Sequence, residues 1–485
     1  MVLIVRRAKA ERQPAESISA EIFVHRDSRV VVMLWIEIQF PGSVKRAFSR
    51  QFHWFAVQLK PGARNGPLDL RATIGENDPA LGGIILGFNA KPIYYLRVLV
   101  LASTSAGGPR LCVVRLQWAN MDAGNTRPQQ KIMTTVTIVG AGFMGSAMAW
   151  PLSDNGHQVR LVGTHLDTDI IKSCIEKRFH PKLKRKLPEN VQPFYIEDLA
   201  KALDGVQVIV SGVSSPGVHW IGRTLAPHAR PGMRLLAITK GLEAAADGQL
   251  RILPDVLKDE FPAAVRDQMS FAAVGGPCIA GELAARRHTC VYFTSRDAAV
   301  LPELRALFKT AYYHIFLSTD IIGVEVCVAL KNAYTLGVGL ADGMLAQLPP
   351  DEAGMKNDNP AAAIFGATAR EMARLVSVLG GNPEKVTSLP GVGDQYVTCM
   401  GGRTVRLGRL LGKGLTYERA RAEMAGETLE SAFVIEQIAK ALPGLEARGL
   451  IGPDELPLTR ALCRTISDGA IAQIDFDRLF QDDVN

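Results

Sequence analysis

The sequence contains few cysteines, and none of them form a Cys-x-x-Cys motif. Their number is odd and their spacing irregular, which argues against a disulfide framework and against a zinc site. A reducing compartment fits this pattern, so we expect a cytoplasmic protein without a bound metal. Each cysteine is interpreted as a small buried hydrophobic residue. The seven are Cys112, Cys174, Cys278, Cys290, Cys327, Cys399 and Cys463.

Long hydrophobic runs are also absent from the chain. No stretch reaches the ~18 apolar residues of a membrane-spanning helix. The nearest, residues 84–101, is interrupted by Asn89, Lys91, Pro92 and Arg97. We therefore expect no integral membrane contact. Hydrophobic residues still make up 47% of the 485 positions, enough to bury the cores of about three domains.

The net charge of +7 is distributed unevenly. Residues 1–132 hold 18 Lys and Arg against 9 Asp and Glu, whereas the remainder holds 37 against 39. The basic residues are spread out and lack the interleaved aromatic residues of nucleic-acid grooves. We expect no nucleic-acid partner.

Residues 1–132 contain strand-like runs at 30–40, 93–102 and 111–118 but no recognisable chemical motif. Three interpretations remain open: an additional β-rich interaction domain, an unusual transit segment, or a basic extension that is not part of the working protein. The third is favoured because the sequence from Met133 onward resembles the natural start of a dinucleotide-binding enzyme. The predicted division of the chain is 1–132, 133–318 and 319–485.

A glycine-rich motif follows a short apolar run at residues 136–139. Gly140, Gly142 and Gly145 form G-x-G-x-x-G, with Phe143 and Met144 between the last two, and a helical pattern follows. Strand, glycine turn and helix together are the context in which this motif binds a dinucleotide. The first glycine permits a tight turn, the second admits the pyrophosphate, and the third lets helix and strand pack closely.

Further strand-like runs alternate with helical stretches up to about residue 294. A second strand at 157–162 ends at Thr164, where no clear acidic residue and no Arg indicates a choice between NAD and NADP. Lys240 follows the strand at 235–238, at the edge where ligands bind in such sheets. The fold class is therefore α/β, with a Rossmann-type doubly wound parallel sheet. The other expected strands lie at 207–210, 271–274 and 290–294.

The pattern changes to helical from about residue 320, so a mostly helical C-terminal domain is expected. Residues 323–340 are apolar on nearly all sides, which predicts a buried helix. Glu325 and Lys331 lie within it, and buried charges are rare unless they are paired or functional. Further helices are expected at 361–379, 417–424 and 431–442.

Six motifs, in this order and spacing, resemble the NAD(P)-dependent glycerol-3-phosphate dehydrogenase family from about residue 135 to residue 467. They are GAGFMG at 140–145, TKGLE at 239–243, GPCIAGE at 276–282, GVEVCVALKN at 323–332, GVGD at 391–394 and TCMGGRT at 398–404, with GETLES at 426–431 a weaker seventh. The resemblance implies reversible reduction of dihydroxyacetone phosphate to sn-glycerol 3-phosphate, NAD or NADP as cofactor, a role in glycerophospholipid supply, and a homodimer.

The resemblance also implies roles for individual residues. Catalysis is expected of Lys331, Lys240 and Asp394, because the alkoxide formed by hydride transfer needs a cation and a proton donor. The small phosphorylated substrate is expected to contact Lys240 and three residues of the sixth motif, and the cofactor a separate set. The substrate set is Arg403, Thr404, Thr398 and Lys240; the cofactor set is Gly140, Gly142, Phe143, Met144, Gly145, Thr164, Ala280, Arg403 and Glu430.

Each assignment has a structural alternative. Lys331 could form an ion pair with Glu325, and Lys240 and Arg403 could be solvated surface residues. Asp394 could shape a turn, and Thr398 could be a plain packing residue or a residue that caps backbone with its hydroxyl.

The chain departs from the usual family pattern near the substrate. It carries Cys278 and Ile279 in place of Thr or Ser and Phe, Thr404 in place of Asn, Ala367 in place of Arg, and a longer polar loop at 345–359. Hydride transfer is thus better supported than the substrate. The alternatives are a related dehydrogenase for another small hydroxy compound, such as a β-hydroxyacid, or a non-catalytic dinucleotide-binding protein.

Overall fold

The computed structural model describes residues 133–349 and 357–480, together with the backbone of seven strands in residues 1–132. The chain divides into two compact units, Met1–Gln130 and Lys131–Asn485. The strands of the first unit pair in the order β4-β1-β3-β2-β6-β7-β5, and the strand-like runs expected at 30–40, 93–102 and 111–118 are among them. They are β1 (Val2–Arg6), β2 (Ser17–Ile22), β3 (Val32–Gln39), β4 (Trp54–Gln58), β5 (Arg71–Thr73), β6 (Leu96–Leu101) and β7 (Leu111–Trp118).

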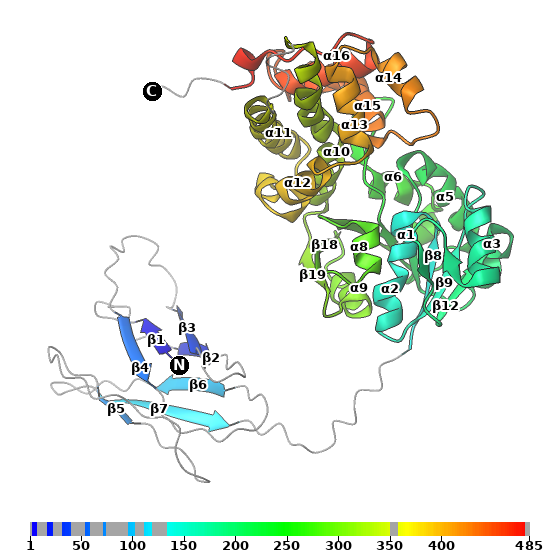
Figure 1. The fold of residues 1–485 in the computed structure, drawn as a ribbon. Helices are drawn as coiled ribbons and strands as arrows, with labels where there is room; N and C mark the ends of the chain where they lie inside the picture. The colour runs from blue at the N-terminus through cyan, green and yellow to red at the C-terminus, as the bar shows by residue number, and fades with distance from the viewer. Residues whose placement is uncertain are drawn as a thin grey trace. The chain divides into compact units, whose positions relative to one another are not determined.

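The second unit is built on an eight-stranded sheet in the order β12-β9-β8-β13-β14-β17-β18-β19 (Figure 1). Its strands are short and rich in Val, Ile and Leu, as expected for strands buried on both faces. The predicted Rossmann-type architecture is confirmed. The strands are β8 (Thr135–Val139), β9 (Gln158–Val162), β12 (Val191–Phe194), β13 (Val208–Ser211), β14 (Arg234–Ala237), β17 (Ser270–Gly275), β18 (Thr289–Ser295) and β19 (Tyr313–Ser318).

Helices cover both faces of this sheet, and each face has its own buried apolar cluster. One cluster joins the sheet to α1, α2, α3, α8 and α9, and the other joins it to α4, α5 and α6. The helices are α1 (Phe143–Ala147), α2 (Ala149–Asp154), α3 (Thr168–Lys177), α4 (Leu199–Leu203), α5 (Val218–Leu225), α6 (Leu253–Asp259), α7 (Ala263–Arg266), α8 (Ala280–Ala284) and α9 (Val300–Phe308). Two short hairpins lie between them: β10 (Phe179–His180) with β11 (Arg185–Lys186), and β15 (Leu242–Ala244) with β16 (Leu250–Ile252).

The sheet differs from an all-parallel one at a single step. All neighbouring strands run parallel except β17 and β18, which are antiparallel. β19 then pairs with β18 in parallel, although the sequence pattern predicts no strand there. Its strand character depends on this pairing with a distant segment, which local pattern does not reveal.

The helical part of the second unit is gathered beyond one end of the sheet (Figure 1). Its longest helix, α10 (Ile321–Met344), contains the predicted segment 323–340 and is buried along nearly its whole length. Three helices here have no counterpart among the predicted ones: α12, α13 and α16. The remaining elements are α11 (Asp358–Val378), α12 (Asp394–Cys399), α13 (Arg403–Gly412), α14 (Tyr417–Glu423), α15 (Glu430–Ala447) and α16 (Pro457–Ser467).

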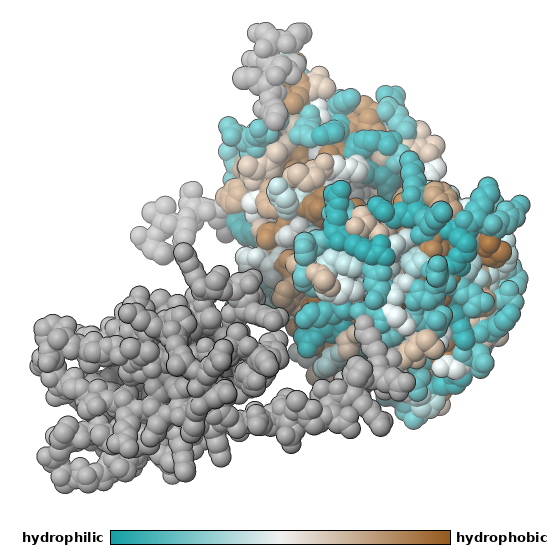
Figure 2. Space-filling view, turned by 60° about the horizontal axis from the view of Figure 1, so that its bottom comes forward, coloured by the Kyte–Doolittle hydropathy of each residue, from teal (hydrophilic) through white to brown (hydrophobic). Residues whose placement is uncertain are grey.

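Of the described helices, α10 alone is long and apolar enough to cross a membrane, but its most apolar stretch is 89% buried inside the protein. Its partners are other helices and β17, so its apolar surface is covered by protein. The face shown in Figure 2 is largely hydrophilic over the coloured residues, with hydrophobic side chains scattered in small patches.

Glycines hold α10 and α13 in backbone contact. A Cβ atom on Gly343 would lie 2.2 Å from the Arg409 carbonyl oxygen, and one on Gly412 would lie 2.2 Å from the Leu340 carbonyl oxygen. Gly339 and Gly408 meet in the same way one turn earlier. Because Lys331 lies on α10 and Arg403 begins α13, this packing sets the relative position of two predicted site residues.

The close approach of α10 and α13 predicts a sharp response to one methyl group. Gly343→Ala should lower the free energy of unfolding by about 2–3 kcal/mol, because the added carbon meets backbone that cannot move aside. Gly281→Ala in α8 is the matched control, since a Cβ there meets no heavy atom within 4 Å. Urea denaturation of both variants measures the difference. Equal midpoints would contradict the packing.

Candidate functional site

The glycine motif lies where the strand order of the sheet reverses, between β8 and β13. Gly140 has a φ of +114°, and a Cβ atom there would lie 2.6 Å from the Gly212 carbonyl carbon. A Cβ on Gly145 would lie 2.1 Å from the Gly140 carbonyl oxygen, whereas one on Gly142 would meet nothing within 4 Å. The first and third glycines therefore serve packing. The second leaves open space, which fits the approach of a dinucleotide pyrophosphate.

Two residues that the sequence reasoning did not select hold this loop. The Asp167 carboxylate accepts hydrogen bonds from the backbone N–H of Ala141 at 3.1 Å and of Thr164 at 3.0 Å, and from the Thr164 hydroxyl at 2.8 Å. The His180 ring lies 3.1 Å from the Ala141 carbonyl oxygen. Burial lowers the pKa of His180, so the neutral ring donates this bond.

The loop at 276–282 packs against the glycine motif. The Cys278 Sγ lies 3.8 Å from the Met144 Sδ, and Ala280 begins α8. Phe143 and Ile279 are exposed at this point, with 55% and 45% of their surface accessible. The structure thus brings the predicted cofactor residues of both motifs together at one end of the sheet.

The three predicted catalytic residues form one buried cluster. The Asp394 carboxylate, which has no exposed surface, accepts a bond from the Lys240 Nζ at 2.6 Å and another from the Lys331 Nζ. The Lys240 Nζ also donates to the Gly276 carbonyl oxygen at 3.0 Å. Lys240 follows β14, Lys331 lies on α10 and Asp394 begins α12, so three separate segments meet here.

The two lysines differ in proton affinity although both are buried. Burial and the neighbouring Lys240 charge lower the pKa of Lys331 to about 8, against the opposing effect of Asp394. Burial also disfavours the charge of Lys240, but Asp394 outweighs it and the pKa of Lys240 is raised. Near neutrality Lys240 is a fixed cation, whereas Lys331 can give up and regain a proton.

Two polar residues, Ser215 and His219, bind the segment that carries Lys240. The Ser215 hydroxyl donates to the Lys240 carbonyl oxygen at 2.9 Å. His219 on α5 lies between Glu243 at 2.8 Å and Glu260 at 2.5 Å. Hydrogen bonding to Glu260 and then to Glu243 raises the pKa of His219. No sequence motif marks these residues, because their partners lie on other segments.

The structure rejects the pairing of Lys331 with Glu325. Glu325 is fully buried, neither of its carboxylate oxygens has a partner among the described residues, and Lys331 binds Asp394 instead. Lys240 is also not a solvated loop residue, since only 20% of its side chain is exposed.

The remaining predicted residues lie on the helical side. Arg403 is exposed at the start of α13 and has no ion pair with a described residue, and Thr404 follows it half-buried. Glu430 begins α15. This helix packs on β15, the strand that follows Lys240 in the chain. The Thr398 hydroxyl donates to the Asp394 carbonyl oxygen at 2.7 Å, one turn earlier within α12.

The chain matches one known protein family over both the sheet and the helical part. The family described as NAD-dependent glycerol-3-phosphate dehydrogenase matches in both parts, its N-terminal domain at residues 135–301 and its C-terminal domain at 320–474. A glycerol-3-phosphate dehydrogenase [NAD(P)+] of Streptococcus suis is 31% identical over 341 residues, covering 69% of this chain and 93% of the relative.

The chain belongs to the NAD-dependent glycerol-3-phosphate dehydrogenase family.

Two further glycerol-3-phosphate dehydrogenases are also similar to this chain. The NADP(+)-dependent glycerol-3-phosphate dehydrogenase of Archaeoglobus fulgidus is 36% identical over 289 residues, covering 60% of this chain and 83% of the relative. The crystal structure of a glycerol-3-phosphate dehydrogenase from Coxiella burnetii matches with a TM-score of 0.59 and 28% identity, covering 72% of this chain and 98% of that one.

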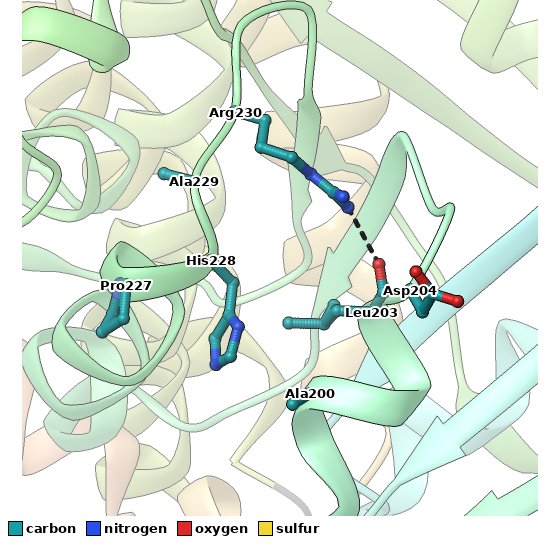
Figure 3. A pocket seen from close by; sticks show the side chains of 7 residues that line it. All are labelled: Ala200, Leu203, Asp204, Pro227, His228, Ala229 and Arg230. Carbon is teal, nitrogen blue, oxygen red and sulfur yellow. Dashed lines mark hydrogen bonds between the residues drawn. The ribbon is translucent and has the colours of Figure 1, made fainter.

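A surface hollow away from this site is not a candidate for the substrate site. It is lined by residues of the α4 end and of the segment after α5, and Arg230 closes one side by donating to the Leu203 carbonyl oxygen at 2.9 Å (Figure 3). Its guanidinium is therefore engaged by backbone. None of the family motifs contributes a residue to this hollow.

The His219 contacts predict a pH-dependent contribution to stability. Because the folded pKa is raised above the ordinary value of 6.5, the contribution is complete below that value and is lost as pH rises through the folded pKa. His219→Gln should therefore lower the thermal midpoint more at pH 6 than at pH 9. His228→Gln is the control, since His228 forms no ion pair with a described residue, in contrast to His219. A pH-independent difference would contradict the charge pairing.

Proposed function

We propose that this protein is an NAD(P)-dependent glycerol-3-phosphate dehydrogenase that reversibly reduces dihydroxyacetone phosphate to sn-glycerol 3-phosphate. The observation that carries the proposal is the Asp394 carboxylate shared by Lys240 and Lys331 beside the 276–282 loop, which packs against the glycine motif. A ketone reductase needs a proton donor and a fixed positive charge beside the cofactor, and the two lysines differ in pKa in the required sense.

Lys331 and Lys240 have different roles in the proposed reaction. When bound, the nicotinamide supplies the hydride that reduces the ketone carbon. In the proposed reaction the protonated Nζ of Lys331 gives its proton to the ketone oxygen as the new C–H bond forms. Lys240 stays charged, orients that oxygen and stabilises its developing negative charge. Asp394 holds both ammonium groups in place, and in the oxidation direction neutral Lys331 accepts the proton instead.

The substrate phosphate is assigned to the start of α13. Arg403 is the first residue of this ten-residue helix, and two glycines with positive φ, Gly401 and Gly402, precede it. No side chain caps the helix, so its first backbone N–H groups remain available to an anion. An Arg guanidinium binds phosphate oxygens in pairs. We assign Thr404 and Thr398 to the same substrate; Thr404 is one of the departures from the family pattern.

The cofactor is NAD or NADP, held by the glycine loop. The assigned contacts are Gly140, Gly142, Phe143, Met144, Gly145, Thr164, Ala280, Arg403 and Glu430. The close packing of Gly140 and Gly145 and the open space at Gly142 support the first group. The Asp167 carboxylate accepts hydrogen bonds from Thr164. It is therefore not available to bind the ribose hydroxyls of NAD, and the proposal extends to both cofactors.

Broader parts of the proposal rest on family resemblance. We propose a cytoplasmic homodimer that supplies glycerophospholipid synthesis, with a dinucleotide-binding domain at 133–318 and a catalytic domain at 319–485.

Substrate discrimination tests the function directly. Oxidation of NADH or NADPH by the full-length chain should require dihydroxyacetone phosphate and should not occur with unphosphorylated dihydroxyacetone. Arg403→Ala should raise the KM for the phosphate ester about tenfold or more, because a charge-assisted phosphate contact is lost. Arg406→Ala is the control, since Arg406 pairs with Glu427 at 2.8 Å. Equal KM changes in both variants would defeat the phosphate assignment, and turnover of a β-hydroxyacid alone would replace the proposed substrate.

The pKa of Lys331 predicts the pH dependence of the reaction. In the reduction direction kcat/KM should fall as pH rises through about 8, because only protonated Lys331 can donate. Lys331→Ala should lower kcat by about 100-fold or more and make the fall above pH 8 less steep. Steady-state rates across pH 6–10 provide the measurement. Near-normal turnover by the alanine variant would exclude Lys331 as the proton donor.

A further inference from the structure

Glu325 is a buried acid with no hydrogen-bond partner. It lies in the first half of α10, has no exposed surface, and neither carboxylate oxygen has a partner among the described residues. An isolated buried carboxylate is costly, and such a group normally stays protonated instead. Glu325 shares its helix with Lys331 and plays no part in the mechanism described above.

A second buried glutamate shows what a structural role looks like in the same protein. Glu371 on α11 accepts bonds from the backbone N–H of Leu458 and Thr459 at 2.8 Å each, and from the Thr459 hydroxyl at 2.6 Å. It thereby caps the start of α16. Three donors surround the Glu371 carboxylate, whereas the Glu325 carboxylate has none, so packing and capping do not explain Glu325.

The charged groups that act on Glu325 come from other segments. Burial raises the pKa of Glu325 to about 8; the Lys240 charge opposes this rise, and Asp255 on α6 adds to it. The glutamate thus lies within electrostatic reach of the fixed lysine of the active centre. Its ionisation would cancel part of the positive charge available to an anionic substrate.

We propose that Glu325 is a positioning residue that acts through Lys240: it is a neutral acid in the active enzyme, and its ionisation at alkaline pH weakens the hold of the centre on the anionic substrate. With Glu325 protonated and Lys331 charged, the two lysines and Asp394 leave one net positive charge. With Glu325 ionised that charge is neutralised. The activity consequence rests on the proposed function, whereas the protonation state does not.

The proposal predicts the steepness of the alkaline limb. Both Lys331 and Glu325 lose a proton near pH 8, so wild-type kcat/KM for reduction should fall by more than about tenfold per pH unit just above it. Glu325→Gln is permanently neutral and similar in size. It should match wild type within about twofold at pH 7, fall only about tenfold per unit, and exceed wild type several-fold at pH 9.

The experiment combines these pH profiles with infrared spectra of the full chain. A protonated carboxyl band should be present at pH 7, should disappear as pH rises through about 8, and should be absent from Glu325→Gln. Glu371→Gln is the matched control: it should lower the thermal midpoint but leave the pH profile and the titrating band unchanged.

The outcomes separate this proposal from the proposed function. If Glu325→Gln loses most of its activity at pH 7, or leaves the steepness unchanged, Glu325 does not act as a neutral acid on the centre. A missing carboxyl band in the wild type overturns the proposal in the same way. If the band titrates but the wild type never turns over dihydroxyacetone phosphate, the proposed function fails and the neutral buried acid is supported.

Discussion

The sharing of the Asp394 carboxylate between Lys240 and Lys331 is the contact on which the proposed active centre depends. It joins the carboxyl end of β14 to α10 and α12, so one buried side chain links the sheet to the helical part of the protein. Such a buried cluster contributes little net stability, because desolvation offsets the attraction between the charges. Loss of one member leaves an unpaired buried charge. The arrangement therefore serves to hold two ammonium groups at fixed positions.

Glycine determines how closely the surrounding backbones approach. Gly140 and Gly145 bring the loop after β8 against its own helix and against the end of β13, while Gly343 and Gly412 bring α10 against α13. In both places a single methyl group would lie within 3 Å of backbone atoms. The cofactor loop and the helix that begins with Arg403 thus have little freedom to shift, and pre-positioned groups of this kind are what hydride transfer requires.

The described residues of the helical part contain three buried acids in three different situations. Asp394 is paired with two cations, Glu371 accepts three hydrogen bonds, and Glu325 has no partner. The environment alone separates their roles: charge balance at the centre, capping of a helix, and a protonated acid near the centre. Asp167 adds a fourth case outside the helical part, since its carboxylate braces the glycine loop instead of facing outward.

Local pattern was sufficient to predict much of this protein. Apolar runs of β-branched residues located six strands of the sheet, the glycine spacing located the cofactor loop, and the apolar stretch at 323–340 located α10. The order of six short motifs led to the family and to Lys240, Lys331, Arg403 and Asp394. These signals lie within a few residues of one another, or in chain order, and both are readable without coordinates.

Tertiary structure decided everything that depends on residues far apart in the chain. Lys240 and Asp394 are 154 positions apart, and Lys331 and Asp394 are 63 apart. Neither sequence separation could show that one carboxylate binds both lysines, or that Glu325 binds neither lysine. The antiparallel step to β18, the strand β19 and the bracing of the glycine loop by Asp167 and His180 belong to the same class. Pairing partners and burial set these features, and both exist only once the chain has folded.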